Sequence, residues 1–242
     1  MLDEAAVMCG PDRRRSTHTF SLREVTVAAQ DSWVHFSGVR LGQHRHVCAF
    51  FNSIDEEYRV LRSFIRDGFD RGEKTTYIVD HANRQDHLAQ LRKAGVDVQE
   101  KMGTGQLDVL PWTDMYVRDH CFDQDAMLAS VEELIQSGTA AGYALTRLVG
   151  HHMDWLFRDK SAVNDLLEYE ARLNNVLSKY NDPVICTYDL TKFGANVAMD
   201  IMRTHEVAII GGVLQENPFY VPPDQFLVEM QGRRSARATL AS

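Results

Sequence analysis

The sequence predicts an α/β fold with a mostly parallel central sheet and helices on both faces of that sheet. The first observation is residues 44–80, where a short apolar run, 47–51, is followed by a helical apolar period and a β-rich run, 75–79. Strand, helix and strand in this order form a βαβ unit with parallel strands. The second observation is that β-rich runs and helical periods keep alternating along the rest of the chain.

The later elements follow from the same two periods. After residue 80 we expect helices at 84–93, 125–138, 162–180 and 195–203, and strands at 106–110, 143–150, 183–190 and 207–210. Residues 96–98 are expected to be extended, and residues 111–122 to form a long loop. Long loops at the carboxyl ends of parallel strands are where such folds place ligands.

The chain divides into three parts. Residues 42–230 form the expected globular domain, and residues 231–242 a flexible tail. Residues 1–41 are an N-terminal extension, with disorder expected at the start and a hairpin expected from the runs 25–27 and 33–36.

Composition excludes several classes of protein. The hydrophobic fraction of 44% suffices for a sizeable core, and no apolar run is long enough to span a membrane. The 4 cysteines are scattered and no signal peptide is visible, so a reduced, cytoplasmic protein is expected. The net charge is −8 and the acidic excess lies in 41–230, which argues against direct nucleic-acid binding.

The loop after the first buried strand is unsuited to phosphate. A phosphate loop needs glycines, a Lys and a Ser or Thr for Mg²⁺. Here Asn52 and Ser53 are followed by the carboxylates of Asp55, Glu56 and Glu57, with no Gly and no Lys. The scaffold therefore resembles that of a nucleotide hydrolase with its catalytic loop replaced. The carboxylates either cap the following helix or orient a polar ligand.

Candidate ligand-binding residues follow the predicted strands. Polar and aromatic side chains near the carboxyl ends could wall a small-molecule pocket, with core packing as the alternative. Together with the loop residues Asn52, Ser53, Asp55 and Glu56, the candidates are Trp112, Tyr116, Arg147, His151, His152, Trp155, Tyr188 and Asp189.

Two groups among these allow different interpretations. His44, His46, His151 and His152 could bind a metal, but the first two begin a strand and the last two end one, so no metal site is predicted. Arg147 lies in an apolar strand and needs a carboxylate, for which Asp154, Glu170 and Asp189 are candidates; the alternative is an anionic ligand.

Six motifs in order resemble one known family. They are HVCAFF-x-SIDEE, GFDRGEKTTYIV, GHHMDW, LLEYEARLN, CTYDLTKF and THEVAIIGGVLQENPFYVPP. This set is similar to the MEDS domain, the methanogen/methylotroph, DcmR-type sensory domain. The resemblance implies a RecA/KaiC-like core without a phosphate loop, which binds a small organic or hydrocarbon-derived ligand.

The resemblance also implies how the domain acts. We expect a non-catalytic sensor without a cofactor, which regulates a signalling partner such as a histidine kinase or a transcription regulator; homo-oligomerisation is left open. One alternative is a docking regulator of a kinase or transcription factor that binds no small ligand. The other is a hydrolase- or lyase-type enzyme that uses His151, His152, Asp154 and Asp189.

Overall fold

A seven-stranded sheet forms the centre of the computed structural model, which describes residues 34–36, 39–41, 45–112, 117–118, 121–151 and 160–241. These residues all belong to one compact unit, 33–242. In spatial order the strands are β11 (Val213–Glu216), β10 (Val207–Ile210), β3 (His46–Phe51), β9 (Val184–Asp189), β8 (Thr146–His151), β4 (Lys74–Val79) and β5 (Leu107–Pro111). Neighbouring strands are parallel except β10 and β11, which are antiparallel. The predicted fold class is confirmed.

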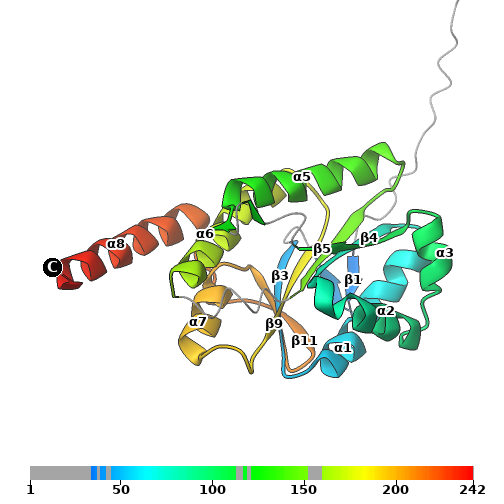
Figure 1. The fold of residues 1–242 in the computed structure, drawn as a ribbon, viewed down its shortest axis with the longest axis horizontal. Helices are drawn as coiled ribbons and strands as arrows, with labels where there is room; N and C mark the ends of the chain where they lie inside the picture. The colour runs from blue at the N-terminus through cyan, green and yellow to red at the C-terminus, as the bar shows by residue number, and fades with distance from the viewer. Residues whose placement is uncertain are drawn as a thin grey trace, which may run out of the picture. The chain divides into compact units, whose positions relative to one another are not determined.

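Helices cover both faces of the sheet (Figure 1). One face carries α1 (Ile54–Asp70), α2 (Arg84–Lys93) and α3 (Val98–Gly103); the other carries α5 (Gln124–Ala140), α6 (Lys160–Leu177), α7 (Ala195–Arg203) and α8 (Pro223–Ala241). The chain moves one way across the sheet from β3 through β4 to β5, and the other way from β8 through β9 to β10. Because parallel crossovers are right-handed, this reversal places the two sets of helices on opposite faces.

Two apolar cores result from this arrangement. Side chains alternate along each strand, so Val47, Ala49 and Phe51 of β3 pack toward α1, whereas Cys48 and Phe50 pack toward α6 and α7. Strands buried on both faces read as unbroken apolar runs, which is why residues 47–51 were recognisable as a strand.

Several segments differ from the sequence-based expectation. The piece 96–98, expected to be extended, is not a strand: residue 98 begins α3, because Asp97 caps the helix by accepting a hydrogen bond from the Glu100 N–H (3.0 Å). A hairpin is present, but it pairs β1 (Val34–Phe36) with β2 (Val39–Leu41), and the run 25–27 lies outside the described residues. The long loop contains a short antiparallel pair, β6 (Val117–Arg118) and β7 (Cys121–Phe122).

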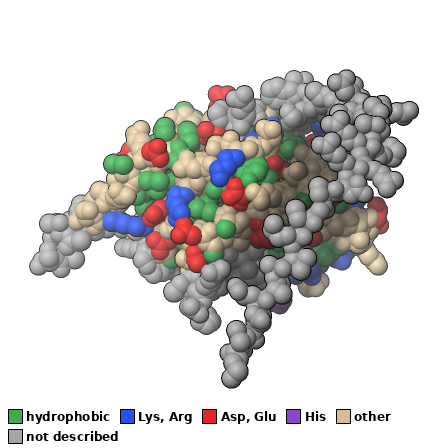
Figure 2. Space-filling model, turned by 90° about the horizontal axis from the view of Figure 1, so that it is seen from above, with side chains coloured by type: hydrophobic (Ala, Val, Ile, Leu, Met, Phe, Trp, Pro, Cys, Tyr) green, Lys and Arg blue, Asp and Glu red, His purple; other side chains and the backbone are tan. Residues whose placement is uncertain are grey.

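The expected C-terminal tail continues α8 as far as Ala241. Two of its arginines pair with carboxylates of neighbouring helices. Arg234 lies 3.1 Å from Asp165 and 2.8 Å from Glu168 of α6, and Arg233 lies 2.9 Å from Asp200 of α7. On the face drawn in Figure 2, Lys and Arg side chains likewise lie among Asp and Glu side chains. These ion pairs hold the part of α8 that extends beyond the apolar core against α6 and α7.

A buried arginine fastens α1 to the sheet. Arg147 of β8 is fully buried and contacts Glu73 (2.5 Å), Asp67 (2.7 Å) and the carbonyl oxygen of Phe64 (2.5 Å). These are not the carboxylates expected from the sequence. The reason is the alternation along β8, which directs Arg147 toward α1, whereas Glu170 lies on the opposite face. Gly68 makes room for it, because a Cβ at that position would lie 2.7 Å from the Arg147 Nε.

We predict opposite effects for two glycine-to-alanine substitutions. Gly68→Ala should lower the free energy of unfolding by about 1–3 kcal/mol, because the added methyl group displaces Arg147 from its partners. Gly103→Ala, at an exposed helical position with no atom within 4 Å of the new Cβ, should raise it by up to about 1 kcal/mol. Urea unfolding of both variants checks this, and a stable Gly68→Ala variant would contradict the role given to Gly68.

Candidate functional site

Residues 52–57, between β3 and the first turn of α1, include the residues that cap this helix. Ser53 is the N-cap residue of α1, and its hydroxyl accepts a hydrogen bond from the Glu56 N–H at 3.2 Å. The Glu56 carboxylate accepts in return from the backbone N–H of Asn52 at 2.9 Å and from its side-chain amide at 3.1 Å. These hydrogen bonds from Asn52 lower the pKa of Glu56. Asp55 accepts from the side chain of Gln90 in α2 at 2.7 Å.

Glu57 points away from this exposed loop and into the core. Its carboxylate lies 2.8 Å from Nε2 of His151, and both side chains are buried. The His151 ring lies 3.8 Å from the ring of His87, whose Nδ1 is 2.6 Å from the hydroxyl of Tyr58. His151, at the carboxyl end of β8, is thus held in a polar group on the α1 face of the sheet.

A small cavity lies on the opposite face, between the sheet and the helices α5 and α6. Its volume is about 40 Å³. We call it the α5–α6 cavity. The apolar side chains around it come from β4, β8, β9, α5 and α6: Ile78, Met127, Val131, Leu148, Leu166 and Val184. The lining also includes Tyr169, Glu170, Cys186, Thr187 and Tyr188.

Tyr188 and Glu170 form a hydrogen-bonded polar pair in the lining of this cavity. The Tyr188 hydroxyl donates to Oε1 of Glu170 at 2.6 Å, and both residues are buried. The other oxygen of the Glu170 carboxylate lies 3.2 Å from Nε2 of His46. Burial, together with the neighbouring Glu170 carboxylate, raises the pKa of Tyr188 well above its usual value. The pair is therefore a phenol that donates to a carboxylate.

Among the described residues, one buried group of side chains could hold a metal ion. His46, Glu170, Cys186 and His205 each place one donor atom within 4.8 Å of the others. Only His46 belonged to the histidines considered for a metal from the sequence. The other three are separated by long stretches of chain, so no spacing pattern links them. Each does lie in one of the motifs that carried the family resemblance.

The remaining candidates are placed as follows. Asp189 accepts from the backbone N–H of Thr191 at 2.8 Å and so stabilises the turn after β9. Trp112 is half-buried and packs against the core on the α5–α6 side. Two of the twelve candidates, His151 and Tyr188, line the α5–α6 cavity, although the His151 side chain pairs with Glu57. Arg147 lies in the ion-pair group with α1. Tyr116, His152 and Trp155 lie outside the described residues, as does Asp154.

Comparison with solved structures finds similarity to a KaiC-like protein from the hyperthermophilic archaeon Pyrococcus horikoshii OT3. The two chains are 14% identical, and the match covers 68% of this chain and 69% of the other with a TM-score of 0.46. No curated protein sequence matches this chain. No helix in the described ranges combines the length and apolar character that a membrane crossing requires.

One protein-family model matches the chain. It is MEDS, the methanogen/methylotroph, DcmR sensory domain, and it covers residues 45–206. The match starts at the residue before β3 and ends at the residue before β10. It therefore includes every strand and helix around the α5–α6 cavity. It also includes the four buried residues that could hold a metal ion: His46, Glu170, Cys186 and His205. The chain belongs to the MEDS family of sensory domains.

Proposed function

We propose that this sensory domain detects a small, largely apolar organic molecule in the α5–α6 cavity and passes the signal to a partner protein without catalysing a reaction. The observation that carries the proposal is the make-up of the cavity. Apolar side chains surround most of it, and the polar groups of Glu170 and Tyr188 form a hydrogen-bonded pair in its lining. Small-molecule sites typically combine apolar walls with a few convergent polar groups.

The volume of the cavity limits the size of the ligand. An engineered apolar cavity of roughly 150 Å³ binds benzene, and a single water needs roughly 10–15 Å³. At about 40 Å³ the α5–α6 cavity fits a molecule with only a few heavy atoms. A short organic compound with one polar group suits it: the carbon chain would contact Val131 and Leu148, and the polar group would reach Glu170.

The loop after β3 supports a role other than nucleotide hydrolysis. It has no lysine to reach a phosphate, and Ser53 and Glu56 are engaged with the helix that follows. A triphosphate brought to the start of α1 would meet the carboxylates of Asp55 and Glu56. The N-terminus of α1 is instead capped by the Ser53 hydroxyl, and the Glu56 carboxylate accepts from Asn52 just before it.

Helix α6 connects the cavity with the rest of its face. Leu166 and Glu170 of α6 line the cavity, and Asp165 and Glu168 of the same helix pair with Arg234 of α8. A ligand that displaced α6 would therefore displace α8 with it. We propose that this helix pair presents the signal to the partner, such as a histidine kinase or a transcription regulator.

Filling the cavity should abolish binding of small apolar probes. Val131→Phe places a larger side chain in the cavity, whereas Val228→Phe makes the same change on α8, where Val228 is 68% exposed. We expect dissolved xenon and a series of short alcohols, followed by ¹²⁹Xe and protein NMR, to bind the unmodified protein and Val228→Phe but not Val131→Phe. Affinity along the alcohol series should fall once the chain exceeds the cavity.

Equal binding to all three proteins would place the ligand elsewhere and overturn the proposal. The folded state of Val131→Phe is checked independently by near-ultraviolet circular dichroism. A cooperative unfolding transition would show that lost binding reflects the filled cavity and not an unfolded chain.

Two neighbouring glutamates should have unequal structural roles and no role in nucleotide binding. Glu57→Ala should lower the free energy of unfolding by about 3 kcal/mol, because it removes a buried partner of His151. Glu56→Ala should lower it by about 1 kcal/mol, because only a helix cap is lost. Chemical denaturation measures both values. Isothermal titration should detect no binding of Mg²⁺–ATP to the unmodified protein, and measurable ATP hydrolysis would contradict the assignment.

A further inference from the structure

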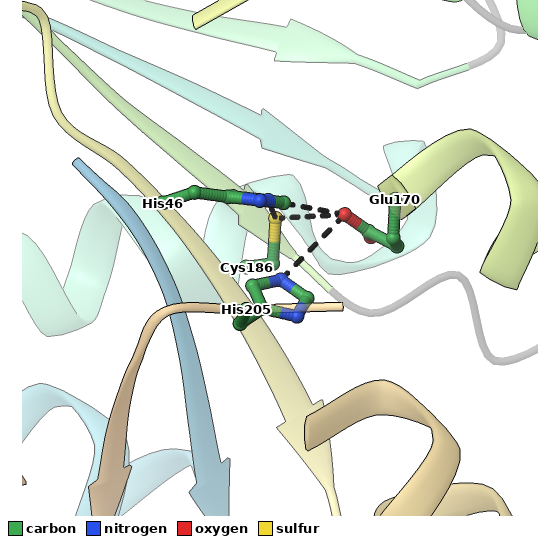
Figure 3. Close-up of side chains that lie close together, drawn as sticks. All are labelled: His46, Glu170, Cys186 and His205. Atoms are coloured by element: carbon green, nitrogen blue, oxygen red, sulfur yellow. Dashed lines mark hydrogen bonds and ion pairs between the residues drawn. The ribbon is translucent and has the colours of Figure 1, made fainter. Parts of the chain in front are cut away.

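Four donor side chains from separate parts of the chain meet between the sheet and the helices α5, α6, α7 and α8 that cover one of its faces (Figure 3). His46 begins β3, Glu170 lies in α6, Cys186 lies in β9, and His205 lies just before β10. All four are buried; His205 has 0% and Cys186 8% relative exposure. We call this set the buried donor cluster. It goes beyond the proposed ligand cavity and does not depend on it.

Hydrogen bonds fix which nitrogen of His46 faces the cluster. The amide nitrogen of Asn174 donates to the carbonyl oxygens of Glu170 (3.0 Å), Ala171 (3.3 Å) and Thr204 (2.8 Å). Its amide oxygen, 3.1 Å from Nδ1 of His46, is therefore an acceptor. Nδ1 of His46 must then carry a hydrogen. In the neutral ring this leaves the lone pair on Nε2, which lies 3.2 Å from Glu170.

His205 is oriented in the same way. Its Nδ1 lies 2.9 Å from the carbonyl oxygen of Ile201, which can only accept, so Nδ1 is the donor. In the neutral ring the lone pair is therefore on Nε2. Its Nε2 makes no hydrogen bond to any described residue, and it points at Glu170 from 3.6 Å.

The cluster thus contains more hydrogen-bond acceptor atoms than hydrogens that can be donated to them. The lone pair of a neutral imidazole and a carboxylate oxygen face each other in a region without solvent, an arrangement that costs free energy unless a positive charge lies between them. Metal-binding histidines commonly donate the hydrogen of their other nitrogen to a carbonyl or carboxyl oxygen. Asn174 and the Ile201 carbonyl provide this support here.

Four of the six spacings between the donor atoms are close to those of tetrahedral coordination, and all six are within 4.8 Å. With bonds of roughly 2.0–2.3 Å from Zn²⁺ to nitrogen, oxygen and sulfur, the ligand atoms of a tetrahedron are roughly 3.3–3.7 Å apart. Glu170 lies 3.2 Å from His46, 3.6 Å from His205 and 3.7 Å from the sulfur of Cys186, and Cys186 lies 3.5 Å from His46. These four distances lie close to the tetrahedral range.

We propose that His46, Glu170, Cys186 and His205 bind a divalent transition-metal ion, with Zn²⁺ as the best match. Two imidazoles, a thiolate and a carboxylate suit Zn²⁺, whereas Mg²⁺ and Ca²⁺ prefer oxygen ligands alone. On binding, the Cys186 thiol loses its proton to solvent and its sulfur bonds to the metal. The ion supplies the positive charge that the buried carboxylate and thiolate need.

The surface offers a route to the cluster. His46 also lines a hollow of about 450 Å³ at the amino-terminal edge of the sheet, together with Asn174, Asn175, Tyr180 and Glu206. Glu170 and Cys186 line the α5–α6 cavity on the inner side. A bound ion would therefore lie between the hollow and the cavity.

Metal analysis of the full chain, purified without an affinity tag, tests the site. Protein stripped with a chelator and dialysed against Zn²⁺ should retain about one ion per chain by plasma mass spectrometry. Co²⁺ in place of Zn²⁺ should give the visible bands of a tetrahedral ion and a near-ultraviolet sulfur-to-cobalt charge-transfer band. That band reports a bound thiolate directly, independently of any sensory output.

Matched variants assign the band to Cys186. Cys186→Ser should lose it, whereas Cys48→Ser, which changes the buried cysteine paired with Cys186 in the neighbouring strand, should keep it. The double variant Cys9→Ser and Cys121→Ser should keep it as well. Asn174→Ala, which removes the support of His46, should weaken Co²⁺ binding by roughly 10–100-fold while the band persists at saturation.

Three results would overturn the proposal. They are a natively folded unmodified protein that retains no ion after dialysis, a Co²⁺ spectrum without the charge-transfer band, and equal loss of the band in the Cys48→Ser and Cys186→Ser variants. Circular dichroism of each stripped variant shows that it is folded before metal is added. Because these measurements use no organic ligand, failure of the metal site is distinguishable from failure of the proposed cavity.

Discussion

The carboxylate of Glu170 is the charge around which one face of the fold is built. A buried carboxylate is stable only if neighbouring groups replace the water it has lost. Tyr188 donates to one of its oxygens at 2.6 Å, and His46 and His205 approach the other. These partners come from β3, β9 and the turn before β10, so satisfying one side chain fixes helix α6 against three neighbouring parts of the sheet.

The opposite face of the sheet contains a buried positive charge. There the buried charge is the guanidinium of Arg147, and the carboxylates of Glu73 and Asp67 and a backbone carbonyl surround it. Each of these partners accepts a hydrogen bond from an N–H group of Arg147, so donors and acceptors are matched. The Glu170 group is open, since His205 brings a second lone pair where a hydrogen would be needed. This difference is why we propose a metal site at the Glu170 group and not at the Arg147 group.

The sequence predicted the fold better than the site, and the reason lies in the range of each signal. The strands β3 and β10 and the helices α2 and α7 follow from local apolar periods, so residues 47–51 and 195–203 were recognisable in isolation. The buried donor cluster is not local: His46 and Cys186 are 140 positions apart and meet only because β3 and β9 pair. Only the motifs that carried the family resemblance marked these positions, and they did not reveal that the side chains meet.

Side chains of this domain occupy the carboxyl ends of two strands in its central sheet. In open α/β sheets the ligand normally lies outside the carboxyl ends of the strands. Here the carboxyl end of β3 is taken up by the capping of α1, and His151 at the end of β8 is engaged by Glu57. The α5–α6 cavity lies under α5 and α6 and is lined by residues of β4, β8 and β9, and the open set of donors lies nearer the amino-terminal ends of β3 and β10. A sensor that uses this region gains a direct link from its ligand to a helix, because every group that contacts Glu170 also positions α6.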